Sequence, residues 1–213
     1  AKLLQELLEP DSVVAISGGS TMAAVAEEMP ILPFNPTVVP ARGGVGAVVE
    51  YQANVIASVL AERLRGTYKM LHLPDGLSQD SLHMLMTCEP QIKEISDLIS
   101  RTDVLLFGIG TAMRMADQRH IADEVRKQLV DNHAVGEALG QYCDMDGKLI
   151  YSTNNIGLSL PDVAKVPNVI AVAGGQEKAS AIIGVMRACQ KGILIIDEQA
   201  AEGMRQLLQI SAL

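Results

Sequence analysis

Glycines and hydroxyl side chains follow the first apolar run of the chain and form its sharpest candidate for an anion site. Gly18-Gly19-Ser20-Thr21 comes directly after the run 13–16 and precedes a segment of helical character. Backbone amides at a helix start, with hydroxyls beside them, form a cup for phosphate. The same residues also suit an ordinary strand-to-helix turn in which Ser20 caps the helix. This segment alone leaves both interpretations open.

Two cations stand beside similar glycine pairs. Arg42 precedes Gly43-Gly44, and Lys178 comes shortly after Gly174-Gly175. A guanidinium holds phosphate through paired hydrogen bonds. Lys178 falls in the first turn of an expected helix, where the helix dipole disfavours a cation, so a nearby anion would explain its position. We interpret both as phosphate-binding residues, and the alternative is a pair of solvated surface side chains.

The elements that must position these residues are four apolar runs, each ending in glycines and followed by a helix-like segment. Parallel strands place their carboxyl ends along one edge of a sheet, and ligands bind outside that edge where the strand order reverses. We therefore expect one pocket for a phosphorylated ligand at this edge. The four runs are 13–16, 38–40, 104–107 and 169–173.

Strand-like runs alternate with helical patterns along the chain, which predicts an α/β fold: an open, mostly parallel, Rossmann-like sheet with helices on both faces. We expect a single domain over 1–213, with Val49 on the buried face of a helix that follows Gly46, and Gly66 as the C-terminal cap of that helix. The expected strands are 13–16, 37–40, 67–73, 104–107, 169–173 and 193–196, with helices over about 2–9, 21–29, both sides of Pro90, up to about 130, after 178 and up to about 209.

One stretch, 134–160, breaks this alternation. Asp146-Gly147 stands between two strand-like runs, 141–143 and 148–151, and Asp-Gly in this setting is a strong hairpin signal. We expect a small antiparallel excursion beside the main sheet.

Composition excludes several function classes. The chain has 213 residues, 48% hydrophobic, and a net charge of −8, which argues against this chain itself gripping a nucleic-acid backbone. The three cysteines are far apart and form no CxxC pair, so we expect free thiols in a cytoplasmic protein, without a disulfide framework or a metal site. No apolar run approaches the roughly 20 residues of a membrane span.

Several catalytic and nucleotide-binding motifs nearly match and then fail. A P-loop would need a lysine that the first glycine run lacks, and the GxSxG elbow is missed at 18–22. The dinucleotide fingerprint GxGxxG loses its last glycine both at 108–113 and at 44–49. These failures argue against an ATPase, an NAD enzyme and a serine hydrolase, and they make a nucleotide-binding module the weakest reading.

With these loops located, the chain resembles the effector-binding domain of SorC-family transcriptional regulators. The resemblance implies a fold like that of sugar-phosphate isomerases and glucosamine-6-phosphate deaminase. It also implies a winged-helix DNA-binding domain ahead of this segment, whose absence would explain the start at Ala1 and the acidic balance. The residues that carry it span nearly the whole chain: 17–21, 39–44, 52–54, 66–68, 77–78, 108–110, 134–138, 146–147 and 170–175.

The resemblance further implies a phosphorylated sugar as effector, fructose 1,6-bisphosphate, and no cofactor. It implies a homo-oligomer, dimer or tetramer, that meets operator DNA only through the missing domain and has no membrane partner. Carried over by position, phosphate would be held by Gly18, Gly19, Ser20, Thr21, Arg42, Gly175 and Lys178; the sugar would be faced by Gln52, Glu137 and Glu177; and a second phosphate by Arg119, although Gln118 could occupy that column.

Two hypotheses from different classes follow. The first is a sensor, whose ligand shifts an assembly equilibrium through different affinities for its states. The second is an isomerase or deaminase on the same scaffold, which needs a positioned general base. The deaminases carry an Asp-Gly-His run in the loop that here reads Gly110–Arg114, without Asp or His. We therefore favour a sensor that is not an enzyme.

Overall fold

The computed structural model describes residues 1–44 and 48–209. Gly46 lies outside these ranges, and so does part of the second near-match to the dinucleotide fingerprint, at 44–49. Its main sheet has six strands in the order β10-β9-β4-β1-β2-β3, and every pairing is parallel. The chain moves outward one way from β1 and the other way from β4, so the strand order reverses between these two. This confirms the predicted α/β fold. The strands are β1 (Val13–Ile16), β2 (Thr37–Pro40), β3 (Thr67–Tyr68), β4 (Val104–Gly108), β9 (Asn168–Ala173) and β10 (Ile193–Ile196).

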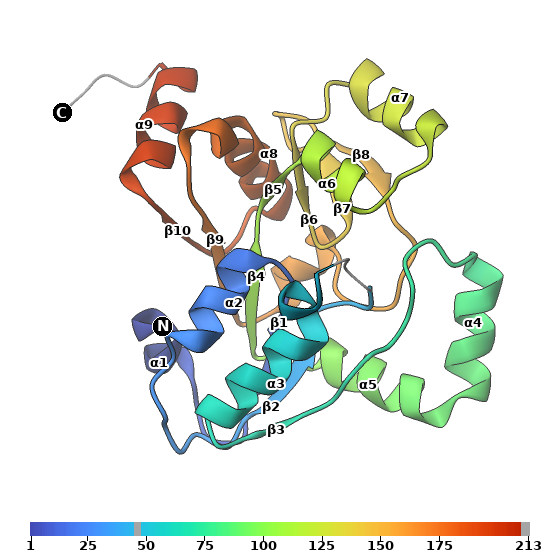
Figure 1. Ribbon diagram of the computed structural model, residues 1–213, viewed down its shortest axis with the longest axis vertical. Coiled ribbons are helices and arrows are strands. Elements are labelled where there is room, and N and C mark those ends of the chain that lie inside the picture. The colour runs from blue at the N-terminus through green and yellow to red at the C-terminus, as the bar shows by residue number, and fades with distance from the viewer. Residues whose placement is uncertain (45–47, 210–213) are drawn as a thin grey trace.

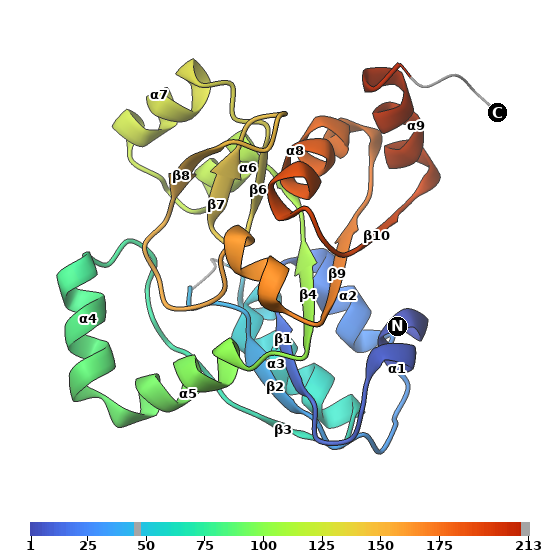
Figure 2. The same ribbon diagram turned by 180° about the vertical axis from the view of Figure 1, so that it is seen from behind.

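Alternating strand side chains build one apolar core on each face of this sheet. On one face Val14 and Ile16 pack with α1 (Lys2–Leu7), α2 (Ser20–Glu27) and α3 (Ala53–Arg63). On the other, Ala15 and Phe107 pack with α5 (Pro90–Ser100), the 3-10 turn η2 (Leu160–Lys165), α8 (Ala179–Cys189) and α9 (Glu198–Leu207). Figures 1 and 2 show these helices on opposite sides of the strands. The continuous apolar runs of the sequence therefore reflect strands that are covered on both faces.

A second, antiparallel sheet stands beside the carboxyl edge of the first, with the order β5-β6-β7-β8. Its β7–β8 hairpin turns at Gly147, whose φ of 85° suits glycine, so the predicted hairpin is confirmed. The strand β5, which leads directly out of the main sheet after β4, was not predicted. The elements of this region are β5 (Gly110–Thr111), β6 (Gly136–Ala138), β7 (Gln141–Cys143) and β8 (Leu149–Ser152), with α6 (Ala112–Gln118) and α7 (Asp123–Asp131) packed on them.

The third strand is much shorter than predicted. We expected 67–73, but β3 ends at Tyr68. Asn54 supplies the reason: its side chain accepts from the Leu71 N–H (2.9 Å) and donates to the Leu71 carbonyl (3.1 Å), which replaces the bonds of a sheet partner. The chain then runs without helix or strand from Lys69 to Ser78, where α4 (Gln79–Cys88) begins.

Both predictions for the ends of α3 need correction. Val49 lies in a separate 3-10 turn, η1 (Val49–Tyr51), and is 66% exposed rather than buried. At the other end Arg65, not Gly66, takes the left-handed conformation (φ 52°). Gly66 donates to the Ala61 carbonyl at 2.8 Å, as in a Schellman motif, and a Cβ there would overlap the carbonyl oxygen of Pro36.

Within the part of the chain that the structure describes, no helix is both long and apolar enough to span a bilayer.

Candidate functional site

The structure places all four predicted glycine junctions at the carboxyl edge of the main sheet, after β1, β2, β4 and β9. Two of them meet at the reversal of strand order. There the Gly108 N–H donates to the Ser17 side chain (3.1 Å), and the Ser17 N–H donates to the Leu106 carbonyl (2.9 Å). The first glycine run therefore stands where open α/β sheets bind ligands.

Gly18-Gly19-Ser20-Thr21 forms the start of α2, as expected. Gly19 is its N-cap with φ 115°, so the alternative of Ser20 as a side-chain cap is wrong. The Gly19 N–H already donates to the Tyr51 carbonyl (2.9 Å), whereas the space that a Gly19 Cβ would take is open. The amides that remain for an anion are those of the first turn of α2, which a helix leaves without partners of its own.

Gln52 lies next to this run because the carbonyl of its neighbour, Tyr51, accepts the Gly19 N–H. It is half-buried at the N-cap position of α3. The predicted contact of Gln52 with a sugar stays a prediction.

Arg42 leaves the end of β2 and is almost entirely buried, with 8% of its side chain exposed. Its Nη2 donates to Asp75 (2.5 Å) and to Thr153 (2.8 Å). A cavity of about 60 Å³ lies beside it, lined by Gln141, Ser152 and Asn155 among others. That volume suits a few water molecules rather than a sugar phosphate.

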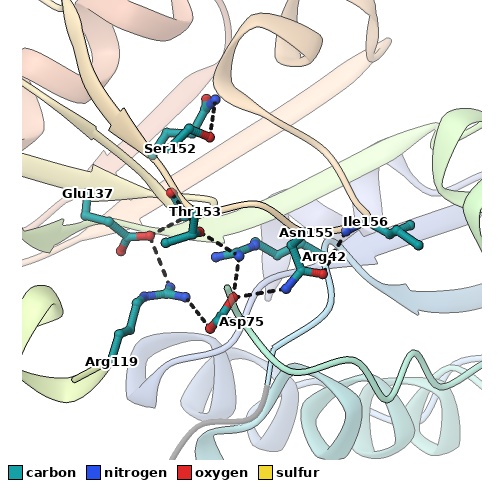
Figure 3. A network of polar contacts seen from close by, with 10 residues as sticks. Arg42, Asp75, Arg119, Glu137, Ser152, Thr153, Asn155 and Ile156 are labelled. Carbon is teal, nitrogen blue, oxygen red and sulfur yellow. Dashed lines mark hydrogen bonds and ion pairs between the residues drawn. The ribbon is translucent and has the colours of Figure 1, made fainter. Parts of the chain in front are cut away.

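Arg119, at the end of α6, and Glu137, in the second sheet, join the same network. Arg119 follows α6 and donates to Asp75 and to Glu137, both at 3.1 Å. Glu137, on β6, also accepts the Gly140 N–H at 2.6 Å. Figure 3 shows the arrangement, with Asp75 between the two guanidinium groups. Two sheets and the end of helix α6 thus bring together three of the predicted ligand residues, with Asp75 from an irregular segment as their link.

Three buried donors in this region find no acceptor among the protein groups: Arg42 Nη1, Arg119 Nε and the hydroxyl of Tyr142. They are the only such side-chain atoms among the residues described. Buried polar groups are nearly always paired in proteins, so an isolated cluster of unpaired donors indicates a place for acceptors from outside. These three donors could bind the oxygen atoms of a ligand such as a phosphorylated sugar.

The electrostatics keep these donors protonated. Burial, followed by the charge of Arg119, lowers the pKa of Arg42 from its very high ordinary value. Burial also lowers the pKa of Arg119, but Glu137 and Asp75 outweigh it, so that pKa is raised. Burial and the charge of Glu137 raise the pKa of Tyr142. All three groups therefore offer hydrogens at neutral pH.

The glycines beside Arg42 allow two side chains to pack closely against the turn. A Cβ at Gly43 would overlap the Asn155 side chain, and one at Gly44 would stand 3.3 Å from Asp75 Oδ2. These glycines therefore leave room for Asp75 and Asn155 next to Arg42.

The residues after β9 form a second charged group, apart from the arginines. Gly175 donates its N–H to Asp197 at 2.9 Å, and a Cβ on Gly175 would stand 2.6 Å from the carboxylate of Glu177. Backbone donors, chiefly Ala200 and Gly175, lower the pKa of Asp197, and Lys178 adds to the effect. The anion near Lys178 in this structure is therefore Asp197.

Sequence reasoning missed four members of the site: Asp75, Tyr142, Thr153 and Asn155. Asp75-Gly76 and the polar stretch after β8 mark turns, but nothing local indicates that they meet Arg42. No three or more His, Cys, Asp or Glu side chains among the described residues are grouped as a metal ion would require.

Comparisons with known proteins agree with this picture. A family model described as "Putative sugar-binding domain" matches residues 1–206. The central glycolytic genes regulators of Bacillus subtilis and Priestia megaterium are each 40% identical to the chain, over 193 and 200 residues. These matches take in 90% and 93% of this chain but 56% and 58% of the regulators, so the chain spans little more than half of their length.

Solved structures match along nearly the whole chain. A SorC-family transcriptional regulator from Enterococcus faecalis has a TM-score of 0.87 at 38% identity, covering 95% of this chain and 84% of that one. The full-length sorbitol operon regulator SorC from Klebsiella pneumoniae has a TM-score of 0.84 at 25% identity, covering 96% of this chain and 68% of that one. These findings confirm the resemblance drawn from the glycine loops. The chain belongs to the sugar-binding domain family of SorC-type transcriptional regulators.

Proposed function

We propose that this domain is the effector sensor of a bacterial repressor of glycolytic genes and that it binds fructose 1,6-bisphosphate. The observation that carries the proposal is the cluster of three buried donors without protein acceptors, two of them on arginines. Phosphate oxygens are acceptors that guanidinium groups bind in pairs. The names of the two 40% identical relatives support the link to glycolytic genes.

The spacing of the cations supports a ligand with two phosphates. Arg42 lies just after β2, and Lys178 lies in the 3-10 turn after β9 (Gln176–Lys178). In the sheet, β4 and β1 stand between β9 and β2. Neighbouring strands lie ~4.8 Å apart, so the two strand ends are roughly 14 Å apart. A sugar with a phosphate at each end offers one phosphate to each cation, and the first turn of α2 lies between them.

The proposed role is binding without catalysis. An isomerase or deaminase needs a carboxylate or histidine free to take a proton. Glu137 is the buried carboxylate of the site, and its Oε1 already accepts from Arg119 and from the Gly140 N–H. The relatives with 40% identity are named as regulators, which agrees with a sensor.

The remaining partners follow from the same proposal. We place the protein in the cytoplasm as a homo-oligomer, dimer or tetramer, whose subunit contacts respond to ligand. Contact with operator DNA belongs to the rest of a longer regulator, since this chain has a net charge of −8.

Calorimetric titration in phosphate-free buffer tests the proposal, with fructose 1,6-bisphosphate, fructose 6-phosphate, fructose and NAD as ligands. We expect the bisphosphate to bind most tightly. Arg119→Ala should weaken it, whereas Arg114→Ala, which changes an exposed arginine on the helix that precedes Arg119, should not.

Two further measurements separate the hypotheses. Sedimentation of the full-length regulator should change with saturating bisphosphate, and an unchanged profile would contradict the assembly mechanism. Product formed from a sugar phosphate, and lost in Glu137→Gln, would favour the enzyme instead.

A further inference from the structure

One carboxylate, that of Asp75, forms ion pairs with both arginines of the site. Its Oδ1 accepts from Arg42 (2.5 Å) and from the Asn155 side chain (3.0 Å), and its Oδ2 accepts from Arg119 (3.1 Å). Figure 3 shows the carboxylate lying between the two guanidinium groups. The two carboxylate oxygens thus accept from three side chains. A phosphate group could accept from the same three side chains and would have one further oxygen to offer.

Asp75 is less buried than Arg42, the more deeply placed of the two arginines that it binds. Its side chain is 24% exposed, against 8% for Arg42. Arg42 belongs to the end of a central strand, whereas Asp75 belongs to the stretch from Lys69 to Ser78, which has no helix or strand. Of the two partners in this ion pair, the carboxylate is the one that can leave.

A ligand phosphate and Asp75 compete for the same donors. With Asp75 and Glu137 in place, the charges of Arg42 and Arg119 are already balanced, two against two. A phosphate that arrived beside Asp75 would face a like charge at close range, which is unfavourable in a partly buried site. A phosphate that replaced Asp75 would gain both guanidinium groups and could reach their unpaired N–H groups as well.

We propose that Asp75 is an internal substitute for the ligand's phosphate, and that an incoming phosphate displaces it from Arg42 and Arg119. The inference rests on the proposed function, because it deepens the binding of a sugar phosphate at this site. The displaced carboxylate carries its segment away from the sheet edge, and α4 follows that segment directly. No residue of α4 is buried, and the helix lies at the periphery of the molecule in both ribbon views (Figures 1 and 2). Ligand binding is thereby linked to the position of a surface helix.

Calorimetric titration of Asp75→Asn with fructose 1,6-bisphosphate tests this inference. Removing the competing charge should tighten binding about tenfold, a conservative figure for one like-charge contact in such a site. Asp80→Asn is the matched control: it removes the same charge five positions away, on an exposed residue, and should leave the affinity unchanged. Equal or weaker binding by Asp75→Asn would overturn the inference, since a carboxylate that contacts the sugar itself gives that result.

Hydrogen exchange of the wild-type protein gives a test that needs no variant. Amides from Asp75 to Cys88 should exchange faster when fructose 1,6-bisphosphate is bound, because Asp75 has left its partners. Slower or unchanged exchange there would contradict displacement. A wild-type protein that binds no sugar phosphate would overturn the proposed function, whereas binding without these effects would overturn only the displacement of Asp75.

Discussion

Gly140→Ala tests whether the buried position of Arg42 is required for ligand binding. Gly140 has φ 77°, and a Cβ there would overlap Nη1 and Cζ of Arg42 and stand 2.5 Å from the Thr153 hydroxyl. Backbone cannot yield easily at this point, because the Gly140 N–H donates to Glu137 and its carbonyl accepts from the Thr153 N–H. The guanidinium of Arg42 must therefore move.

The size of the effect follows from two terms. An alanine in the left-handed conformation costs about 1–2 kcal/mol. Separating one partner of a buried ion pair costs roughly 3–5 kcal/mol, and less here because Asp75 is partly exposed and keeps Arg119. We expect the free energy of unfolding to fall by about 3–5 kcal/mol, which lowers Tm by roughly 10 °C in a domain of this size.

The same change should weaken fructose 1,6-bisphosphate binding by roughly ten- to a hundredfold, since a charge-assisted hydrogen bond contributes about 1.5–3 kcal/mol. Urea unfolding and calorimetric titration measure the two effects. Gly147→Ala is the control: Gly147 has φ 85°, and a Cβ would stand 2.6 Å from the Ala188 nitrogen and 2.8 Å from Arg187 Cβ, with neither Arg42 nor Arg119 among its nearest neighbours. If both variants bind the ligand equally, the position of Arg42 does not matter for binding and the reasoning is refuted.

Three further predictions concern other parts of the molecule. Arg65→Gly should raise the free energy of unfolding by up to about 1 kcal/mol, measured in urea, because Arg65 takes the left-handed conformation (φ 52°) at the end of α3. Burial raises the pKa of Cys143 and of Cys189 to about 12, so both thiols stay protonated and unreactive in native protein up to about pH 9. A thiol titration of the native protein should therefore count only the exposed Cys88. A second reactive thiol would contradict the burial of the other two. Tyr142→Phe removes a buried hydroxyl without a partner, so stability should stay equal or rise by about 1 kcal/mol while bisphosphate affinity falls, and unchanged affinity would exclude that hydroxyl from the site.

The fold could be predicted from the sequence because its signals are local. The strands β1, β2, β4 and β9 are short apolar runs, and their burial on both faces follows from that pattern. The hairpin at Asp146-Gly147 was visible for the same reason. Prediction failed at β3, where the side chain of Asn54, from the preceding helix, takes the hydrogen bonds that a neighbouring strand would otherwise make.

The site was predictable only in part, for a physical reason. Arg42, Arg119 and Glu137 could be named from glycine loops and resemblance, and the structure joins them in one network. Their shared partner Asp75 lies in an irregular segment, where no periodicity indicates which neighbours it meets. The sequence also could not show which groups approach the glycines after Arg42, since a close approach by a side chain and one by a ligand require the same residue.

A domain with a net charge of −8 can bind a sugar bisphosphate only where the local field is reversed. Two guanidinium groups side by side would create such a field, but without a counter-ion they would repel one another inside a buried site. Asp75 and Glu137 provide the counter-charges, but they differ in how firmly they are held. Glu137 is 5% exposed and accepts a hydrogen bond from a backbone N–H, whereas Asp75 is 24% exposed and is bonded only to side chains. Glu137 therefore stays to position Arg119, and Asp75 is the carboxylate whose place an anion can take. Binding then exchanges one anion for another, and the energy of that exchange moves a segment of the chain.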